Sequence, residues 1–405
     1  MSGRGPQEAV DLLSRVIAFR DERVLPQEAA FDRQVGEGAT RWMPVPVLEE
    51  LRAEARKAGL WNLGLSADVG GPGLSQVQYA PLCEAMGWNE WLPEVFNCNP
   101  PDSGNISLLA GFAAPEQKDA WLQPLIEGEI RSCFAMTEPG VASSDAGNIS
   151  MCAEAVGDEW VLNGEKWWIS GPGNPLCRLA IVVALTDPDG PRGQRHSVFL
   201  LPMDTPGLRV VRPLSVFGID FAPRGFCHLA FDNVRIPAAS LVGERGRGFE
   251  IAQGRLGGGR LHHAMRCVGA AERGLRLMCE RSVSRVAFGK PLAELGATAD
   301  LIAQSRIDIN LVRALVLETA RVFDEQGPPA ARSLVSQVKV AAPDMACRVI
   351  DRAIQIHGAA GLSPADTPLA ALYARLRTLR IADGPDAVHL RVIARSELRE
   401  HRHGA

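Results

Sequence analysis

The sequence predicts a multidomain α+β protein: an N-terminal all-α domain, a middle antiparallel β-barrel or sandwich domain, and a C-terminal four-helix bundle. Three observations predict this order. Apolar residues recur every three or four positions in residues 1–130, short apolar runs between turn residues fill residues 131–240, and helical spacing returns in residues 241–405. At 405 residues the chain is long enough for two or three domains, and we place their boundaries at these positions.

The N-terminal region contains four runs with helical spacing. Clusters of Gly, Pro and Asn separate them, as in DVGGPGLS (68–75) and NCNPPDSGN (97–105), and these clusters are predicted to be loops. The four predicted helices are EAVDLLSRVIAF (8–19), VPVLEELRAEARKAG (45–59), VQYAPLCEAMG (77–87) and EQKDAWLQPLIEG (116–128).

The middle region consists of short β-rich runs. EWVLNGEKWWIS (159–170) is predicted to form two strands around Asn163-Gly164, because both residues tolerate the positive φ of a type I′ turn. The other predicted strands are LAIVVAL (179–185), SVFLLP (197–202), LRVVRP (208–213) and CHLAFDNVRIP (227–237).

Four long helical runs follow with short connections, and this pattern is typical of an antiparallel bundle. They cover residues 248–285, 297–326, 330–358 and 367–381.

Composition excludes several classes of protein. The net charge of −4 gives no basic footprint for nucleic acid, and the longest apolar run, Leu179–Leu185, is too short to cross a membrane. The polar N-terminus does not resemble a signal peptide. Nine cysteines without paired spacing predict reduced thiols, a cytoplasmic location and no metal site.

Four segments carry candidate chemistry, although spacing alone favours a structural role for each. Small residues let a backbone approach a planar or phosphorylated ligand closely. Of the two adjacent tryptophans, alternation along a strand would let one pack in a core while the other faces a pocket. None matches a Rossmann or P-loop fingerprint. The segments are CFAMTEPGVASSDAG (133–147), KWWISG (166–171), RVAFGKPL (285–292) and QIHGAAGL (355–362).

Together and in this order, these segments and FDNVRIPAASLVGERGRGF (231–249) resemble the acyl-CoA dehydrogenase family. Within this family, the sequences of three segments are most similar to the branch with acyl-CoA dehydrogenase family members 10 and 11. The segments are PEVFNCNPPDSGN, SCFAMTEP and RIADGPDAVH. The resemblance implies an FAD flavoprotein that desaturates an acyl-CoA thioester in fatty acid β-oxidation and passes electrons to an electron-transfer flavoprotein. It also implies a homo-oligomer, a tetramer or a dimer, because the flavin site is shared between subunits.

The segment LRIADGPDAVH (379–389) contains the candidate catalytic base. In the family, a Glu-Gly pair just after the last long bundle helix commonly supplies the base, and here that pair is Asp383-Gly384. Some members carry the base just before an arginine on the first bundle helix, but that position is Gly259, before Arg260. The alternative reading is that Asp383 is a helix-terminal acid close to Arg377 and Arg380.

The resemblance assigns further roles residue by residue. Gly257 replaces the acidic residue usual three positions before Arg260, and GRLGGGR is interpreted as room for a bulky or substituted acyl group. The residues expected at the flavin are Met136, Thr137 and Ser144, with Trp168 and Ser170 on its ring system. The residues expected at a neighbouring subunit's FAD are Arg285 and Phe288, with Gln355, Gly358 and Ala359 at the pyrophosphate of that FAD. The residues expected at the substrate are Ser143, Arg260 and Gly384.

Three other readings remain open. An acyl-CoA oxidase or a nitroalkane-oxidase-like enzyme would reoxidise the flavin with oxygen, and an aspartate base fits the latter. A non-enzymatic flavin- or CoA-binding assembly protein is the third. The histidines His262, His263, His357 and His389 are interpreted as structural or solvent-facing. His389 is near Asp383 in the sequence and could tune it, but a surface helix position is favoured.

Overall fold

The computed structural model describes residues 5–402. These residues form two compact units, each with its own core. The sheet unit contains residues 23–73 and 94–258, and the bundle unit contains residues 5–22, 74–93 and 259–402. The predicted fold class, helices followed by a β region and a helical bundle, is confirmed.

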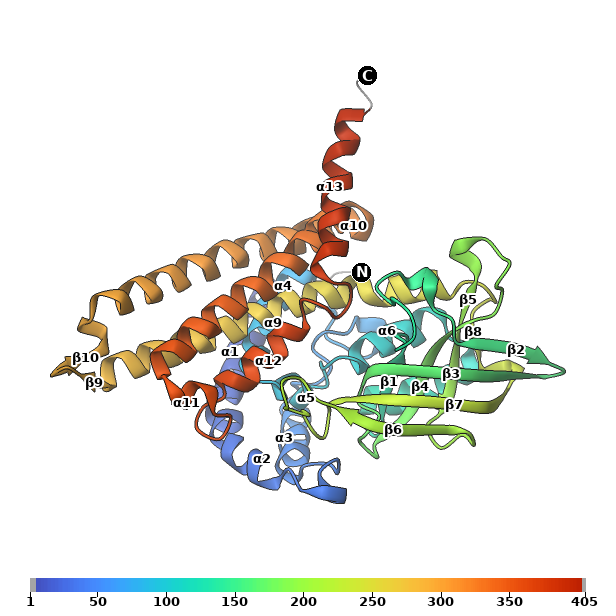
Figure 1. Cartoon of the computed structure of the whole chain (residues 1–405), viewed down its shortest axis with the longest axis horizontal. Coiled ribbons are helices and arrows are strands. Elements are labelled where there is room, and N and C mark those ends of the chain that lie inside the picture. The colour runs from blue at the N-terminus through green and yellow to red at the C-terminus, as the bar shows by residue number, and fades with distance from the viewer. Residues whose placement is uncertain (1–4, 403–405) are drawn as a thin grey trace. The chain divides into compact units, whose positions relative to one another are not determined.

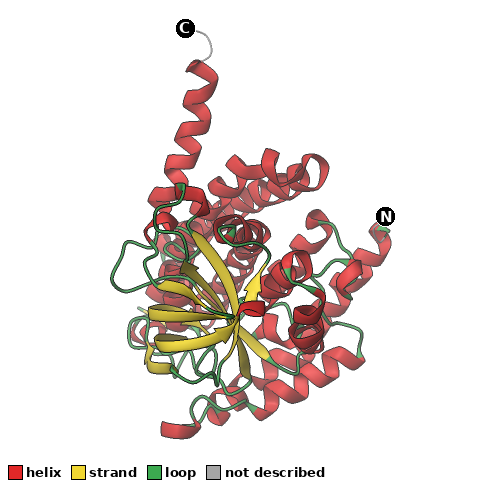
Figure 2. Cartoon of the chain, turned by 90° about the vertical axis from the view of Figure 1, so that its right-hand side faces the viewer, coloured by secondary structure: helices red, strands yellow, loops and turns green. Residues whose placement is uncertain are grey.

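The sheet unit is built on one mixed eight-stranded sheet within the described residues. The strand order is β6-β7-β3-β2-β4-β5-β8, and β1 pairs with β4. The strands fan out with a strong twist in Figure 2. The strands are β1 (Arg131–Ala135), β2 (Cys152–Val156), β3 (Glu159–Ser170), β4 (Cys177–Leu185), β5 (His196–Pro202), β6 (Leu208–Leu214), β7 (Phe226–Pro237) and β8 (Leu241–Val242).

The predicted antiparallel arrangement does not hold for the whole sheet. The strands β1 and β2 both pair with β4 in parallel. The strand β4 lies in the interior of the sheet and is buried on both faces. Its even-numbered residues from Ala180 to Ala184 pack into one core, and its odd-numbered residues from Leu179 to Val183 pack into another. A strand covered on both faces reads as a continuous apolar run, which explains LAIVVAL.

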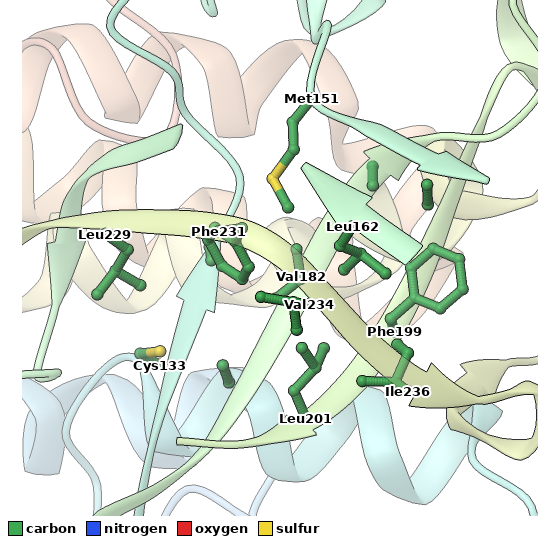
Figure 3. Packing of buried hydrophobic residues seen from close by; sticks show 14 of the residues in the cluster. Cys133, Met151, Leu162, Val182, Phe199, Leu201, Leu229, Phe231, Val234 and Ile236 are labelled. Atoms are coloured by element: carbon green, nitrogen blue, oxygen red, sulfur yellow. The ribbon is translucent and has the colours of Figure 1, made fainter. Parts of the chain in front are cut away.

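The first core is formed by the sheet curling over itself. Val182 of β4 and Leu201 of β5 lie with Val234 and Ile236 of β7 in one buried cluster, as Figure 3 shows. The second core is closed by helices, with Ile106 and others packing on the opposite face. The helices of this unit are α2 (Glu28–Gln34), α3 (Pro46–Lys57), α6 (Asp102–Phe112), α7 (Pro115–Gln117) and α8 (Gln123–Glu127), while α5 (Leu92–Val95) lies at the boundary between the units.

Two local predictions in this unit are wrong. Asn163-Gly164 is not a hairpin turn, because β3 continues through it with a bulge opposite β7, and the turn between β2 and β3 lies at Gly157-Asp158 instead. The stretch NCNPPDSGN is not all loop, because α6 begins at Asp102. Burial of this segment against the sheet therefore decides its structure, despite its turn-forming composition.

The bundle unit is formed by long helices, and Figure 1 shows α9 and α10 joined at one end by the β9–β10 hairpin. The predicted helices 297–326 and 330–358 form one element, α10, with a break at Gly327, where φ is 82°. The α9 and α4 helices approach closely at Gly269, where a Cβ atom would lie 1.9 Å from the carbonyl oxygen of Glu84. The elements are α1 (Pro6–Phe19), α4 (Gln76–Met86), α9 (Gly248–Ser284), β9 (Val286–Ala287), β10 (Lys290–Pro291), α10 (Gly296–His357), α11 (Ala359–Leu362), α12 (Leu369–Thr378) and α13 (Asp386–Arg402), of which α9 begins in the sheet unit.

No helix in the described part of the chain is both long and apolar enough to cross a bilayer.

Candidate active site

Asp383 lies on the short loop between α12 and α13 in the bundle unit, and its backbone is held by two donors. Arg260 Nε donates to the Asp383 carbonyl oxygen at 3.0 Å, and His389 Nε2 lies 3.2 Å from the same oxygen. Asp383 has a φ of +56°, which is uncommon for a residue with a side chain. These contacts hold the loop in a conformation that the chain alone would rarely adopt.

Glycine is required at Gly384 for two reasons. Its φ is +104°, and a Cβ atom there would lie 2.8 Å from His389 Nε2. Lys339 supports the same turn from α10, because its buried ammonium group donates to the carbonyl oxygens of Leu379 and Gly384. The predicted pair Asp383-Gly384 therefore forms a turn that the side chains of Lys339 and His389 hold in place.

The carboxylate of Asp383 contacts a histidine. His263 Nε2 lies 3.3 Å from Asp383 Oδ2, and the Asp383 side chain is 25% exposed. Asp386 turns elsewhere, as expected, and pairs with Arg380 at 2.7 Å. Arg380 also pairs with Asp344 at 3.0 Å.

The expected surface position of His389 is wrong. His389 is buried, with Nδ1 at 3.3 Å from Ser336 Oγ. His262 is also enclosed, with Nε2 at 2.9 Å from Gln76 Oε1 and its ring edge-on to Tyr79. Sequence reasoning missed His263 and Lys339 as neighbours of Asp383 because they come from other helices. It placed His389 near Asp383 but expected it on the surface.

These buried histidines make the bundle sensitive to acid. Burial lowers the pKa of His262 to about 3, and burial together with Arg266 lowers the pKa of His263 to about 4. Burial also lowers the pKa of His389 to about 4. Each folded pKa lies below the ordinary value of 6.5, so the unfolded chain binds more protons and stability is lost as pH falls below about 6.5.

We expect the free energy of unfolding to fall steeply between pH 7 and pH 5, with His262 alone contributing roughly 2 kcal/mol of the loss. Urea unfolding of the wild type and of His262→Gln at both pH values measures this contribution, because glutamine does not titrate. A variant with the full wild-type pH dependence would contradict the assignment.

In the sheet unit, the loop after β1 is anchored by a buried ion pair. Lys166 Nζ donates to Glu138 Oε1 at 2.7 Å and to the Met136 carbonyl oxygen at 2.9 Å. Burial lowers the pKa of Lys166 to about 8, although Glu138 opposes this. Burial alone would raise the pKa of Glu138, but Lys166 and the N–H groups of Ser150 and Met151 lower it below its usual value.

The predicted flavin residues of this unit lie along the same loop and β3. Thr137 and Trp167 pair reciprocally: Thr137 Oγ1 donates to the Trp167 carbonyl oxygen at 2.5 Å, and Trp167 N donates to the Thr137 carbonyl oxygen at 2.9 Å. Trp168 lies in a bulge of β3 with a φ of +55°. Its ring packs edge-on to Phe226, and the residue is 39% exposed. Ser170 ends the strand two residues later.

The two predicted serines of the loop differ in their surroundings. Ser143 Oγ accepts from Glu138 N at 2.9 Å and contacts the Glu138 carbonyl oxygen, so its hydroxyl shapes the loop. Ser144 is exposed. Ser143 is thus used structurally, and a role toward substrate remains a prediction.

The remaining predicted residues lie away from Asp383 in the bundle unit. Arg285 follows the end of α9, 25 residues beyond Arg260, so a helix of that length separates them by roughly 35 Å. Phe288, in the β9–β10 hairpin, is 95% exposed. Gln355, Gly358 and Ala359 at the end of α10 are exposed as well. One chain therefore does not bring these residues to Asp383.

Within residues 5–402, no group of three or more His, Cys, Asp or Glu side chains could hold a metal ion.

Comparison with known proteins gives three family-model matches along the chain. The N-terminal, middle and C-terminal domains of acyl-CoA dehydrogenase match residues 6–129, 133–234 and 246–398.

Individual relatives agree with these matches. The chain is 50% identical over 394 residues to a Mycobacterium tuberculosis protein described as a probable acyl-CoA dehydrogenase, FadE2, covering 96% of this chain and 95% of that one. It is 48% identical over 395 residues to rat acyl-CoA dehydrogenase family member 11, covering 96% of this chain but 50% of the relative. A solved protein from Mycobacterium abscessus matches with a TM-score of 0.94 and 50% identity over 99% of this chain and all of that one.

Proposed function

Because the chain belongs to the acyl-CoA dehydrogenase family of flavoprotein oxidoreductases, we propose that it desaturates an acyl-CoA thioester between its α and β carbons, with Asp383 as the base. The observation that carries the proposal is the Asp383 carboxylate. It lies between α12 and α13 in the Asp383-Gly384 pair that resembles the family's Glu-Gly pair, is partly exposed, and stands on a turn held by Arg260, Lys339 and His389.

The sheet unit supports a flavin site. Trp168 presents an exposed aromatic ring in a strained backbone conformation, next to the hydroxyl-bearing loop of Thr137 and Ser144. An exposed ring held this way suits stacking on a flat ligand. Met136, Thr137, Ser144, Trp168 and Ser170 would hold FAD, which when bound would supply the hydride acceptor for the β-hydrogen.

The chain's own task is then proton removal. Asp383 would take the α-proton onto a carboxylate oxygen while Arg260 and Gly384 fix its turn. An aspartate side chain is one methylene shorter than the family's usual glutamate, so the thioester must approach this turn more closely. Ser143 and Arg260 would contribute to the substrate side.

A second subunit would complete the flavin site. Arg285, Phe288, Gln355, Gly358 and Ala359 are exposed in the single chain and would reach a neighbouring subunit's FAD. Large apolar side chains on the bundle helices, including Leu311 of α10, are also exposed and suit burial between copies. We therefore propose a homo-oligomer, a tetramer or a dimer; a flavin-loaded monomer in sedimentation would contradict it.

The proposed electron acceptor is an electron-transfer flavoprotein, and the proposed setting is fatty acid β-oxidation in the cytoplasm, where nine unpaired cysteines would stay reduced. An acyl-CoA oxidase or a nitroalkane-oxidase-like reaction is the second candidate, because Asp383 replaces the usual glutamate. Oxygen consumption with each substrate separates these candidates.

Glycines on α9 support a proposal on acyl specificity. A Cβ atom at Gly258 or Gly259 would have no heavy atom within 4 Å, so packing does not require glycine there. Glycine costs about 1 kcal/mol relative to alanine inside a helix, which favours a functional reason for the glycine next to Arg260. We propose that Gly259, before Arg260, leaves room for a bulky or substituted acyl group.

We expect Gly259→Ala to stabilise the protein by up to about 1 kcal/mol but to slow turnover of bulky thioesters more than of butyryl-CoA. Gly258→Ala is the matched control, since it points about 100° away around the helix. Unfolding curves and relative kcat/KM values measure both effects. Equal losses for all thioesters would contradict the proposal.

The test of the function is an anaerobic titration of the flavin-loaded protein with saturated acyl-CoA thioesters of graded length, followed by visible absorbance. Bleaching by one class of thioester is the expected result and ranks the substrates. Bound flavin that no thioester bleaches would overturn the assignment and direct attention to nitroalkane chemistry.

A further inference from the structure

Two histidines contact Asp383 in different ways: His263, whose side chain is 12% exposed, and His389, which is buried. His263 Nε2 faces the carboxylate at 3.3 Å, whereas His389 Nε2 faces the backbone carbonyl oxygen at 3.2 Å. The second contact adjusts the turn, but the first acts on the group that would accept the proton. The protonation of His263 therefore bears directly on the strength of Asp383 as a base.

A neighbouring arginine determines which nitrogen of His263 carries the proton. Arg266 Nη2 lies 3.2 Å from His263 Nδ1. A guanidinium group has only N–H donors, so Nδ1 must be the acceptor in this contact. In a neutral imidazole the proton is then on Nε2, the atom that faces Asp383 Oδ2.

We propose that His263 is a positioning residue for Asp383: Arg266 fixes its Nε2–H tautomer, and that N–H donates to the carboxylate and lowers its proton affinity. This rests on the proposed role of Asp383 as the base. A hydrogen bond to the charged form of a carboxyl group favours that form. The arrangement orients one carboxylate oxygen by Nε2–H and keeps Asp383 ionised, ready to take a proton.

The surroundings of Asp383 are consistent with a neutral His263. Burial and Arg266 lower the pKa of His263 to about 4, so it carries a single ring proton at neutral pH. The charged and titratable groups of this cluster include Arg260, His263 and Arg266 of α9, Arg332 and Lys339 of α10, and Asp386 and His389 of α13.

The test compares the rate of anaerobic flavin reduction by one saturated acyl-CoA across pH in four proteins. His263→Leu removes the donor, and we expect its acid limb to move about one pH unit higher. His263→Gln keeps an N–H near the same place and should retain the wild-type midpoint. His262→Gln replaces the adjacent histidine, whose ring contacts Gln76 and Tyr79, and should not move the midpoint.

Equal midpoints in His263→Leu and wild type, or equal shifts in the Leu and Gln variants, would overturn the proposal. Where His263→Leu fails to fold, the proton position in the flavin-loaded wild type still decides. Long-range ¹H–¹⁵N spectra of ¹⁵N-histidine-labelled protein should show Nε2 protonated and Nδ1 bare at pH 7, with the signal assigned through His263→Gln. A proton on Nδ1 would refute it.

Asp383→Asn separates this inference from the proposed function. If that variant reduces its flavin as fast as the wild type, Asp383 is not the base, and the proposed role of Asp383 fails together with this inference. If it does not, while His263→Leu keeps the wild-type profile, only the role of His263 fails.

Discussion

Replacing Asp383 with asparagine is expected to lower the rate of flavin reduction by acyl-CoA about 10³-fold or more while leaving FAD bound. General-base catalysis contributes about 10²–10⁴-fold, and an amide cannot accept the α-proton. Asparagine tolerates a positive φ at least as well as aspartate, so the turn at φ +56° should persist. The measurement is single-turnover absorbance under anaerobic conditions, with the bound flavin quantified in the same sample.

Two neighbouring substitutions serve as controls. Asp386→Asn removes an acid three residues away that pairs with Arg380, and it should retain most of the reduction rate. Asp383→Glu restores the residue usual in the family and should keep a measurable rate. If Asp383→Asn reduces its flavin as fast as the wild type, the base lies elsewhere.

Arg131→Met is expected to cost about 3–5 kcal/mol of unfolding free energy, the largest stability effect we expect from a single substitution. Arg131 Nη2 lies 2.5 Å from Glu94 Oε1 and Nη1 lies 3.5 Å from Asp102 Oδ2, and all three side chains are buried. Burial alone would raise the pKa of Glu94, but Arg131 and Arg224 lower it below its usual value. Removing Arg131 leaves the carboxylates of Glu94 and Asp102 buried with less positive charge to balance them.

Arg178→Met is the matched control for this prediction. Arg178 pairs with Asp204 at 3.2 Å on the surface of the same sheet, with both side chains more than half exposed. Exposed ion pairs contribute about 0–1 kcal/mol, so this variant should unfold close to the wild type. Urea unfolding of both variants measures the difference, and equal midpoints would show that the buried network is energetically minor.

Periodicity predicted most of the long helices because their burial shows in the sequence, but it missed α13, which lies beyond the last predicted helix. The helices α1, α3, α4, α9 and α12 and the two halves of α10 lie where apolar residues recur every three or four positions. Local turn rules failed where tertiary packing overrode them. Asn163-Gly164 continues through β3 because β7 pairs on both sides of it, and α6 forms in a Pro- and Gly-rich stretch because it packs on the sheet.

The sequence by itself determined the order of the domains, the family resemblance and the choice of Asp383 as candidate base, since each depends on patterns local in the chain. Only the tertiary structure decided what surrounds Asp383. His263 and Lys339 come from α9 and α10, and no spacing in the sequence relates them to this loop. His389 lies only six residues after Asp383, but its burial against the turn depends on packing. The physical reason is that hydrogen bonds between helices depend on how the helices pack, and packing brings together residues more than a hundred positions apart.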